Sequence, residues 1–217
     1  MIYFGQFNNP KVDEYLHNTF FKNQNSGFFI ECGAYDGIID SSCLFFEKIL
    51  GWQGINIESD PDMYKLLQKN RPNSKNLHLA LANQENSNKL LQFQRTRSRL
   101  DNSIVGHGFI ESITPDIYKN LPEKNLVSVK STLYPVLATS IKDLVIAYNI
   151  SSIDLLVLDV EGAEEAILKD LCLSPALPKI LCIEDNLGYR ELLDNILLPL
   201  GYEFISKIHV NLHYKLN

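Results

Sequence analysis

The sequence lacks the features of membrane-spanning, secreted and nucleic-acid-binding proteins. No apolar run approaches the roughly 20 residues that cross a bilayer as a helix. The opening, MIYFGQFNNPKVDEY, has neither the basic start nor the apolar middle of a signal peptide. Lysine and arginine total 20 against 26 acidic residues, and the net charge of −6 disfavours a polyanionic partner. We therefore expect a cytoplasmic protein with no membrane span and no nucleic-acid partner.

Cysteine is scarce, and other familiar motifs are missing. Cys32, Cys43, Cys172 and Cys182 lie far apart, without the spacing of a zinc site or a disulfide framework, so we expect buried, reduced thiols. The phosphate-binding pattern G-x-x-x-x-G-K-[ST] does not occur. With 217 residues, 45% of them hydrophobic, and no repeat or linker, the chain is expected to form a single domain over residues 1–217.

What the sequence does contain is an alternation of strand-like and helix-like segments. Strands are predicted at residues 27–33, 54–59, 76–82, 153–160 and 179–185. Helices are predicted at residues 41–50, 60–70, 139–148, 162–171 and 189–201. Strands that are apolar on both faces and separated by helices indicate a parallel sheet covered on both sides, which is an α/β fold. Residues 202–217 predict a closing antiparallel hairpin.

The segment from Arg95 to Lys130 interrupts this rhythm with scattered Gly, Pro and Ser. It is too long for an ordinary connection. Either it is a disordered loop or it is a lid that helps to select the substrate, and we favour the lid. Arg95, Arg97 and Arg99 alternate as on the solvated face of a strand, with an anion-binding role as the alternative.

The first predicted strand runs into a glycine turn, FFIECGAYDG, in which Glu31, Gly33 and Gly37 are spaced E-x-G-x-x-x-G. Glycine allows a sharp turn and a close ligand, and ligands bind at the carboxyl ends of such strands. Glu58 ends the second strand, 58 − 37 = 21 residues later. This spacing is close to the roughly 20 residues typical of an acidic residue that binds a ribose diol. The alternative is a turn that only reverses the chain.

The turn itself favours one nucleoside ligand over another. Tyr35 and Asp36 stand in this turn, so its sequence does not match the G-x-G-x-x-G pattern of dinucleotide sites. A carboxylate there would repel a diphosphate and would suit a ligand with a cationic amino-acid tail. The turn therefore indicates S-adenosylmethionine rather than NAD.

Several segments resemble the FkbM-type S-adenosylmethionine-dependent methyltransferases: FIECGAYDG, GWQGINIESDP and IDLLVLDVEGAEEAILKDL, with FGQFNNPKVDEYL at the start and LGYEFI near the end. The resemblance implies a class I methyltransferase (Rossmann-like) fold, with a mostly parallel seven-stranded sheet, helices on both faces and the C-terminal hairpin. Members act mostly on hydroxyl groups of sugars, glycolipids and polyketides. The resemblance thus implies O-methylation of a carbohydrate or glycoconjugate acceptor.

The same resemblance implies a set of cofactor contacts. They are Glu31, Gly33, Ala34, Tyr35, Asp36, Gly37, Ser42, Glu58, Ser59, Ala80, Leu81, Asn83 and Asp159. Glu58 is the expected ribose ligand, and the residues from Ala80 to Asn83 are expected near the adenine. One departure from the family is IESD, where IEP is commoner, and it affects the contact at Ser59.

Carboxylates also end two later strands. Asp159 closes LLVLD, and Glu184 and Asp185 close ILCIED, 184 − 159 = 25 residues later. Three neighbouring carboxylates repel one another unless a cation or protons intervene, and oxygen ligands favour Mg²⁺ or Mn²⁺ over zinc. The arrangement is similar to that of metal-dependent macrolide and sugar O-methyltransferases. The alternative is that these acids merely begin a helix or a loop.

A base must take the proton of an acceptor hydroxyl, and Glu161, two residues after Asp159, is the candidate. We assign Asp159 and Glu161 as the catalytic pair, with His107 as a second choice for the base. Two alternatives remain open. One is a metal-independent methyltransferase acting on a lipid, polyketide or amine, and the other is a binding module that holds the cofactor without turnover.

Overall fold

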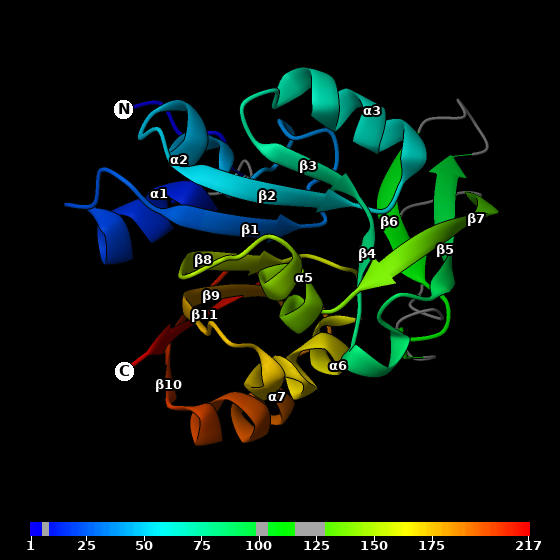
Figure 1. Cartoon of the computed structure of the whole chain (residues 1–217). Coiled ribbons are helices and arrows are strands. Elements are labelled where there is room, and N and C mark those ends of the chain that lie inside the picture. Colours follow the sequence, from blue (N-terminus) through cyan, green and yellow to red (C-terminus); the bar gives the residue numbers. More distant parts are fainter. Residues whose placement is uncertain (6–8, 99–103, 116–128) are drawn as a thin grey trace.

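Seven strands form one sheet in the order β10-β11-β9-β8-β1-β2-β3 (Figure 1). The computed structural model describes residues 1–5, 9–98, 104–115 and 129–217. The strands are β1 (Phe28–Cys32), β2 (Gln53–Glu58), β3 (Lys75–His78), β8 (Ile153–Leu158), β9 (Pro178–Glu184), β10 (Tyr202–Ile208) and β11 (Asn211–Leu216). From β3 across to β9 every pair is parallel, while β11 runs antiparallel to both β9 and β10. The predicted Rossmann-like fold with its closing hairpin is confirmed.

Helices cover both faces of this sheet because its strands are apolar on both sides. On one face lie α1 (Val12–Leu16), the π-helical turn His17–Phe21 and α2 (Leu44–Lys48). On the other face lie α5 (Ile141–Ala147), α6 (Glu164–Lys169) and α7 (Arg190–Leu197). No helix in the described part of the chain is long and apolar enough to cross a membrane.

Helix α3 (Pro61–Asn70) follows β2 and begins as its sequence predicts. Asp60 is the N-cap, and its carboxylate accepts the backbone N–H groups of Asp62 at 2.8 Å and Met63 at 3.1 Å. Pro61 occupies the first turn, where its missing N–H is not needed. The end of β2 and the start of α3 are therefore fixed relative to each other.

Alternate residues of the central strands pack on opposite faces. In β1, Phe29 joins the cluster under α1 and α2, and Ile30 joins the cluster under α5, α6 and α7. Trp52, Phe45 and Phe46 are buried in the first cluster. The four cysteines are free thiols, and Cys32, Cys43 and Cys182 are buried as predicted, whereas Cys172 is exposed.

A second sheet, with the order β4-β7-β5-β6, corrects the prediction for the segment after residue 75. Its strands are β4 (Ala80–Leu81), β5 (Leu90–Ser98), β6 (Ile104–Ile110) and β7 (Val129–Thr139). The single strand predicted at 76–82 divides between the two sheets, as β3 and β4. Within the segment predicted as a loop or lid, residues 95–98, 104–110 and 129–130 belong to the antiparallel strands β5, β6 and β7. Figure 1 shows this sheet beyond the carboxyl ends of β1 and β2.

The prediction for the arginines of this segment was wrong at Arg95. Its side chain is buried rather than solvated, with 1% of its surface exposed. The reason is pairing with Asp60 at the start of α3. Arg97 lies on β5 without a described side chain, and Arg99 and residues 116–128 are outside the described part of the chain.

Candidate active site

A cavity of about 420 Å³ lies between the carboxyl ends of the central strands and the second sheet. This volume is within the range of small-molecule sites. Many residues predicted from the sequence line it: Glu31, Gly33, Ala34, Tyr35, Ser42, Glu58, Ser59, Leu81, Asp159, Glu161 and Glu184. The cavity thus brings together the glycine turn and the carboxylates at three strand ends.

Gly33 is required by the approach of another strand. Its φ is +79°, and a Cβ there would lie 1.8 Å from the carbonyl oxygen of Asp159. The backbone N–H groups of Gly33 and Ala34 donate to the carbonyl of Ile57, each at 3.1 Å. The glycine turn is therefore held against the ends of both β2 and β8.

Asp36 and Gly37 serve the turn itself. The carboxylate of Asp36 accepts the N–H groups of Ile38 at 2.9 Å and Ile39 at 2.8 Å, and in the described part of the chain neither Asp36 nor Gly37 lines the cavity. At Gly37, where φ is +80°, a Cβ would lie 2.6 Å from Cγ of Arg71. Both residues thus make contacts that shape the loop, and the ligand contacts expected of them stay a prediction.

Glu31 lines the cavity floor with a carboxylate that is already hydrogen-bonded. It accepts the hydroxyl of Ser41 at 2.9–3.0 Å and the N–H of Cys43 at 3.1 Å. Arg71, fully buried at the end of α3, lies 3.4 Å from it and 2.6 Å from Glu47. Arg71 was missed in the sequence because nothing in NRPN indicates burial. These contacts fix Glu31 and the Ser41 loop as one unit.

Glu58 is 6% exposed and faces the cavity from the end of β2. One carboxylate oxygen accepts the N–H of Asp60 at 2.6 Å, and the other accepts the N–H of Tyr35 at 2.8 Å. Burial raises the pKa of Glu58 to about 7. The backbone of Ser59 also bonds to this carboxylate, which has about four acceptor positions in all, so acceptor capacity remains for one hydroxyl of a ligand.

The residues expected near an adenine divide between the cavity and the core. Ser59 and Leu81 line the cavity, and the Ser59 hydroxyl donates to the carbonyl of Leu79 at 3.1 Å. Ala80 is 1% exposed inside β4, and Asn83 accepts a hydrogen bond from Asn86 at 2.6 Å. Neither Ala80 nor Asn83 is among the described residues that line the cavity.

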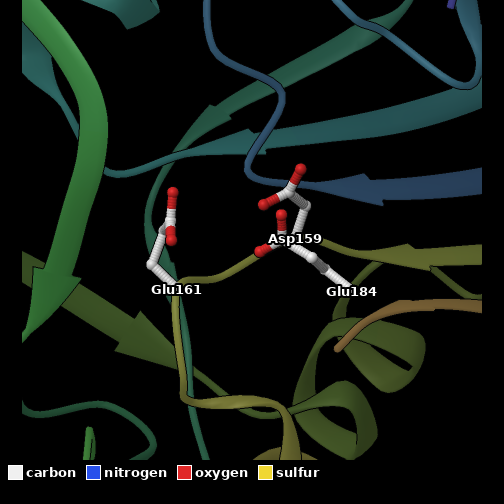
Figure 2. A group of neighbouring side chains, drawn as sticks. All are labelled: Asp159, Glu161 and Glu184. Atoms are coloured by element: carbon white, nitrogen blue, oxygen red, sulfur yellow. The ribbon is translucent and has the colours of Figure 1, made fainter. Parts of the chain in front are cut away.

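Three carboxylates meet at the ends of β8 and β9. Asp159 follows β8, Glu184 ends β9, and Glu161 lies in the turn before α6; one oxygen of each lies within 4.8 Å of the other two. Figure 2 shows Asp159 and Glu184 side by side with Glu161 next to them. Burial, followed by the charges of Asp159 and Glu161, raises the pKa of Glu184 far above its ordinary value. Without a cation, this group therefore holds a proton at neutral pH.

Asp185 was predicted to belong to this acidic group, but its carboxylate lies elsewhere. Its carboxylate accepts the N–H of Tyr189 at 2.7 Å and pairs with Lys207 at 2.9 Å. Asp185 directly follows Glu184, the last residue of β9, and adjacent residues of an extended chain point to opposite sides. Among the described residues, Glu161 takes the position in the acidic group that was expected for Asp185.

The backbone at Glu161 is unusual. Glu161 has a φ of +55° and is followed by Gly162 at +96°. A left-handed conformation costs a non-glycine residue about 1–2 kcal/mol, and such strain gathers at functional sites. Just beyond, Glu164 accepts the N–H of Val160 at 3.0 Å, and burial raises its pKa to about 8. His107, the second choice for the base, lies on β6, and its side chain is outside the described part.

The second sheet supplies one wall of the cavity, from strands that the sequence analysis did not predict. Phe93 and Arg95 of β5 and Gly108, Phe109 and Ile110 of β6 line the cavity. A Cβ on Gly108 would lie 2.2 Å from the ring of Phe93, so this glycine makes room for the ring. The segment LLQFQR does contain the alternation typical of a strand, because Leu91, Phe93 and Arg95 alternate with exposed or half-buried residues.

The fold and the cavity define the class of protein. A Rossmann-like sheet with a buried carboxylate at the end of β2 and a glycine turn after β1 is the class I methyltransferase fold. The family model of the FkbM methyltransferase domain matches residues 31–204, and the chain belongs to this family. S-adenosylmethionine is the cofactor expected from the family.

Comparison with solved structures finds a TehB-like SAM-dependent methyltransferase from Corynebacterium glutamicum. The TM-score is 0.45 at 10% sequence identity, and the match covers 95% of this chain and 88% of that one. No curated protein matches the chain.

Proposed function

We propose that this protein is an S-adenosylmethionine-dependent O-methyltransferase that transfers a methyl group to a hydroxyl of a sugar in a glycan or glycoconjugate, assisted by a divalent metal and acting as a single domain. One observation carries the proposal. The Glu58 carboxylate and the group of Asp159, Glu161 and Glu184 line the same cavity. The end of the cavity at Glu58 suits a nucleoside, and the end at the three carboxylates suits the activation of a hydroxyl.

For the cofactor, the donor and acceptor chemistry fits. The acceptor capacity that remains on Glu58 suits a hydroxyl of a ribose diol, and its buried setting strengthens such a bond. The backbone of Gly33 and Ala34 and the carboxylate of Asp159 lie further along the cavity. Negative charge there is compatible with the ammonium of an amino-acid tail.

A divalent cation also fits the acidic group. Asp159, Glu161 and Glu184 offer hard oxygen ligands within 4.8 Å of one another, and their mutual repulsion is what a cation would relieve. Mg²⁺ or Mn²⁺, when bound, supplies positive charge that favours loss of a proton from an acceptor hydroxyl. Each of these three residues would offer one oxygen to it, with Glu161 in the place first expected for Asp185 and its second oxygen left to accept a proton.

In the proposed reaction, Glu161 accepts the proton of the acceptor hydroxyl. The hydroxyl oxygen forms a bond to the methyl carbon, the carbon–sulfur bond breaks, and its electron pair stays on sulfur. A positioned base contributes about 10²- to 10⁴-fold. Alignment of oxygen and methyl carbon supplies up to roughly 7–11 kcal/mol, so positioning by the cavity walls is the larger effect.

The walls also support a second candidate acceptor. Ile39, Met63, Phe93, Phe109 and Ile110 line the cavity with apolar surface. Such a lining suits a lipid or polyketide, or a sugar that carries an apolar group. One result distinguishes the alternative, a metal-independent methyltransferase of the same fold. A chelator would leave its methyl-transfer activity unchanged.

The test is calorimetric titration of the protein with S-adenosylmethionine, followed by methyl transfer to a panel of sugars, glycolipids and polyketides with Mg²⁺ or with a chelator. We expect micromolar binding and transfer to a sugar hydroxyl only with metal. Glu58→Gln should weaken binding, while Glu203→Gln, an exposed carboxylate on the edge strand β10, should not. Binding without transfer to any acceptor would favour a non-catalytic module, and no binding would refute the proposal.

A further inference from the structure

Arg95 connects the second sheet to the start of α3. It is almost fully buried, and Nε and Nη2 donate to the two carboxylate oxygens of Asp60. Nη1 donates to Asp62 at 2.8 Å and to the hydroxyl of Tyr134 at 2.9 Å. The guanidinium also lies 4.2 Å from the centre of the Tyr134 ring. All of these contacts hold one cation rigidly in the cavity wall.

Asp60 in turn contacts the carboxylate that we assign to the cofactor. Its backbone N–H donates to Glu58 at 2.6 Å, and its side chain caps α3 through the N–H groups of Asp62 and Met63. A continuous series of bonds thus runs from Arg95 through Asp60 to Glu58. A planar, bidentate guanidinium–carboxylate pair fixes orientation as well as distance.

We propose that Arg95 is a positioning residue for Glu58, and that the second sheet thereby sets the affinity of the protein for the nucleoside part of its cofactor. The inference rests on the proposed function, because it takes Glu58 as the ribose ligand. Arg95 acts through Asp60, and it has no role in the chemical step.

The charges around Glu58 support this assignment. Burial raises the pKa of Glu58 to about 7, backbone N–H groups lower it, and the charge of Asp60 raises it. Arg95 faces the same region from β5 and balances Asp60. From β1, Cys32 presents a thiol whose pKa is raised by burial, and His78 of β3 is the register partner of Glu58. Removing the guanidinium therefore leaves the charge of Asp60 unopposed beside Glu58.

The experiment measures the dissociation constant of S-adenosylmethionine from pH 6 to pH 9 by calorimetry. In Arg95→Gln, we expect affinity at pH 7 to fall by about tenfold or more, in line with the loss of a charged hydrogen bond. The loss should shrink toward pH 9, because Glu58 needs a higher pH to ionise. Arg95→Gln with Asp60→Asn removes both charges and should return the midpoint of the pH profile toward that of the wild type.

Two further variants separate positioning from general damage. Glu111→Gln removes an exposed carboxylate just after β6, and it should keep the wild-type affinity and pH profile. Arg95→Lys keeps the charge but not the bidentate pair, so it should bind more weakly with an unshifted profile.

The outcomes are distinct. If the wild type does not bind S-adenosylmethionine, the proposed function fails. If the wild type binds and folded Arg95→Gln has the same affinity and profile, the inference about Arg95 is overturned. Should Arg95→Gln fail to fold, Arg95→Lys decides, since weaker binding supports the inference and unchanged binding overturns it.

Discussion

The backbone of Gly33 lies so close to that of Asp159 that a Cβ on Gly33 would be 1.8 Å from the Asp159 carbonyl oxygen. The N–H of Asp159 also donates to the carbonyl of Cys32 at 3.1 Å. The turn that follows β1 and the acidic group that follows β8 are therefore one rigid arrangement. Any change that separates these two strand ends should affect nucleoside binding and the acidic group together.

Gly33→Ala tests this closeness. We expect it to lower the free energy of unfolding by more than the ~1–2 kcal/mol that a left-handed alanine costs, because the backbone of Asp159 must also move. Urea unfolding followed by circular dichroism measures the change. Gly51→Ala is the matched control, since φ there is +70° and a Cβ would meet open space among the described residues. Equal losses in the two variants would contradict the argument.

Metal binding should stabilise the protein through the acidic group. At a Mg²⁺ concentration of 100 times Kd, the stabilisation is about 2.7 kcal/mol, seen as a rise in Tm by scanning calorimetry. Glu184→Gln should abolish the rise, because an amide replaces one of the three carboxylates that would hold the cation. Asp185→Asn should lower Tm through its contact with Lys207 yet keep the response to Mg²⁺. The opposite pattern would assign the metal to Asp185.

Glu161→Gln should lower kcat by about 10²-fold or more with little change in the affinity for S-adenosylmethionine. The amide keeps the size of the side chain and cannot accept the proton. The measurement is methyl transfer under saturating acceptor, together with calorimetric titration of the cofactor. Glu165→Gln is the control, because Glu165 pairs with Lys169 at 2.6 Å on α6. A kcat close to that of the wild type would exclude Glu161 as the base.

Glu164 predicts a pH dependence of stability. Burial raises its pKa from 4.5 to about 8 in the folded protein. The folded state therefore binds the proton more tightly than the unfolded state, and stability falls as pH rises from about 4.5 to 8. In chelator, Glu164→Gln should flatten this decline, and Glu165→Gln should leave it in place. Parallel unfolding curves for wild type and Glu164→Gln across that window would disprove the assignment.

The fold of the central sheet was predictable because each of its elements is encoded locally. Apolar runs such as FFIEC and IDLLVL are long enough to be buried on both faces, and Asp60 with Pro61 marks the start of α3 without reference to the rest of the chain. The second sheet was missed because β5 and β7 pair at long range. Exposed leucines at Leu90, Leu133 and Leu137 obscure the alternation of buried and exposed residues in these strands.

By itself, the sequence determined the class of fold, the glycine turn and the carboxylates at the ends of β2, β8 and β9. These features depend on residue type and on the order of the strands, and both can be identified in the sequence. Only the tertiary structure decided which carboxylates meet, replacing Asp185 by Glu161, and that Arg95 lies buried against Asp60. The physical reason is that side-chain direction within a strand and the partner of a buried charge depend on neighbours from distant segments, which pack only when the sheets assemble.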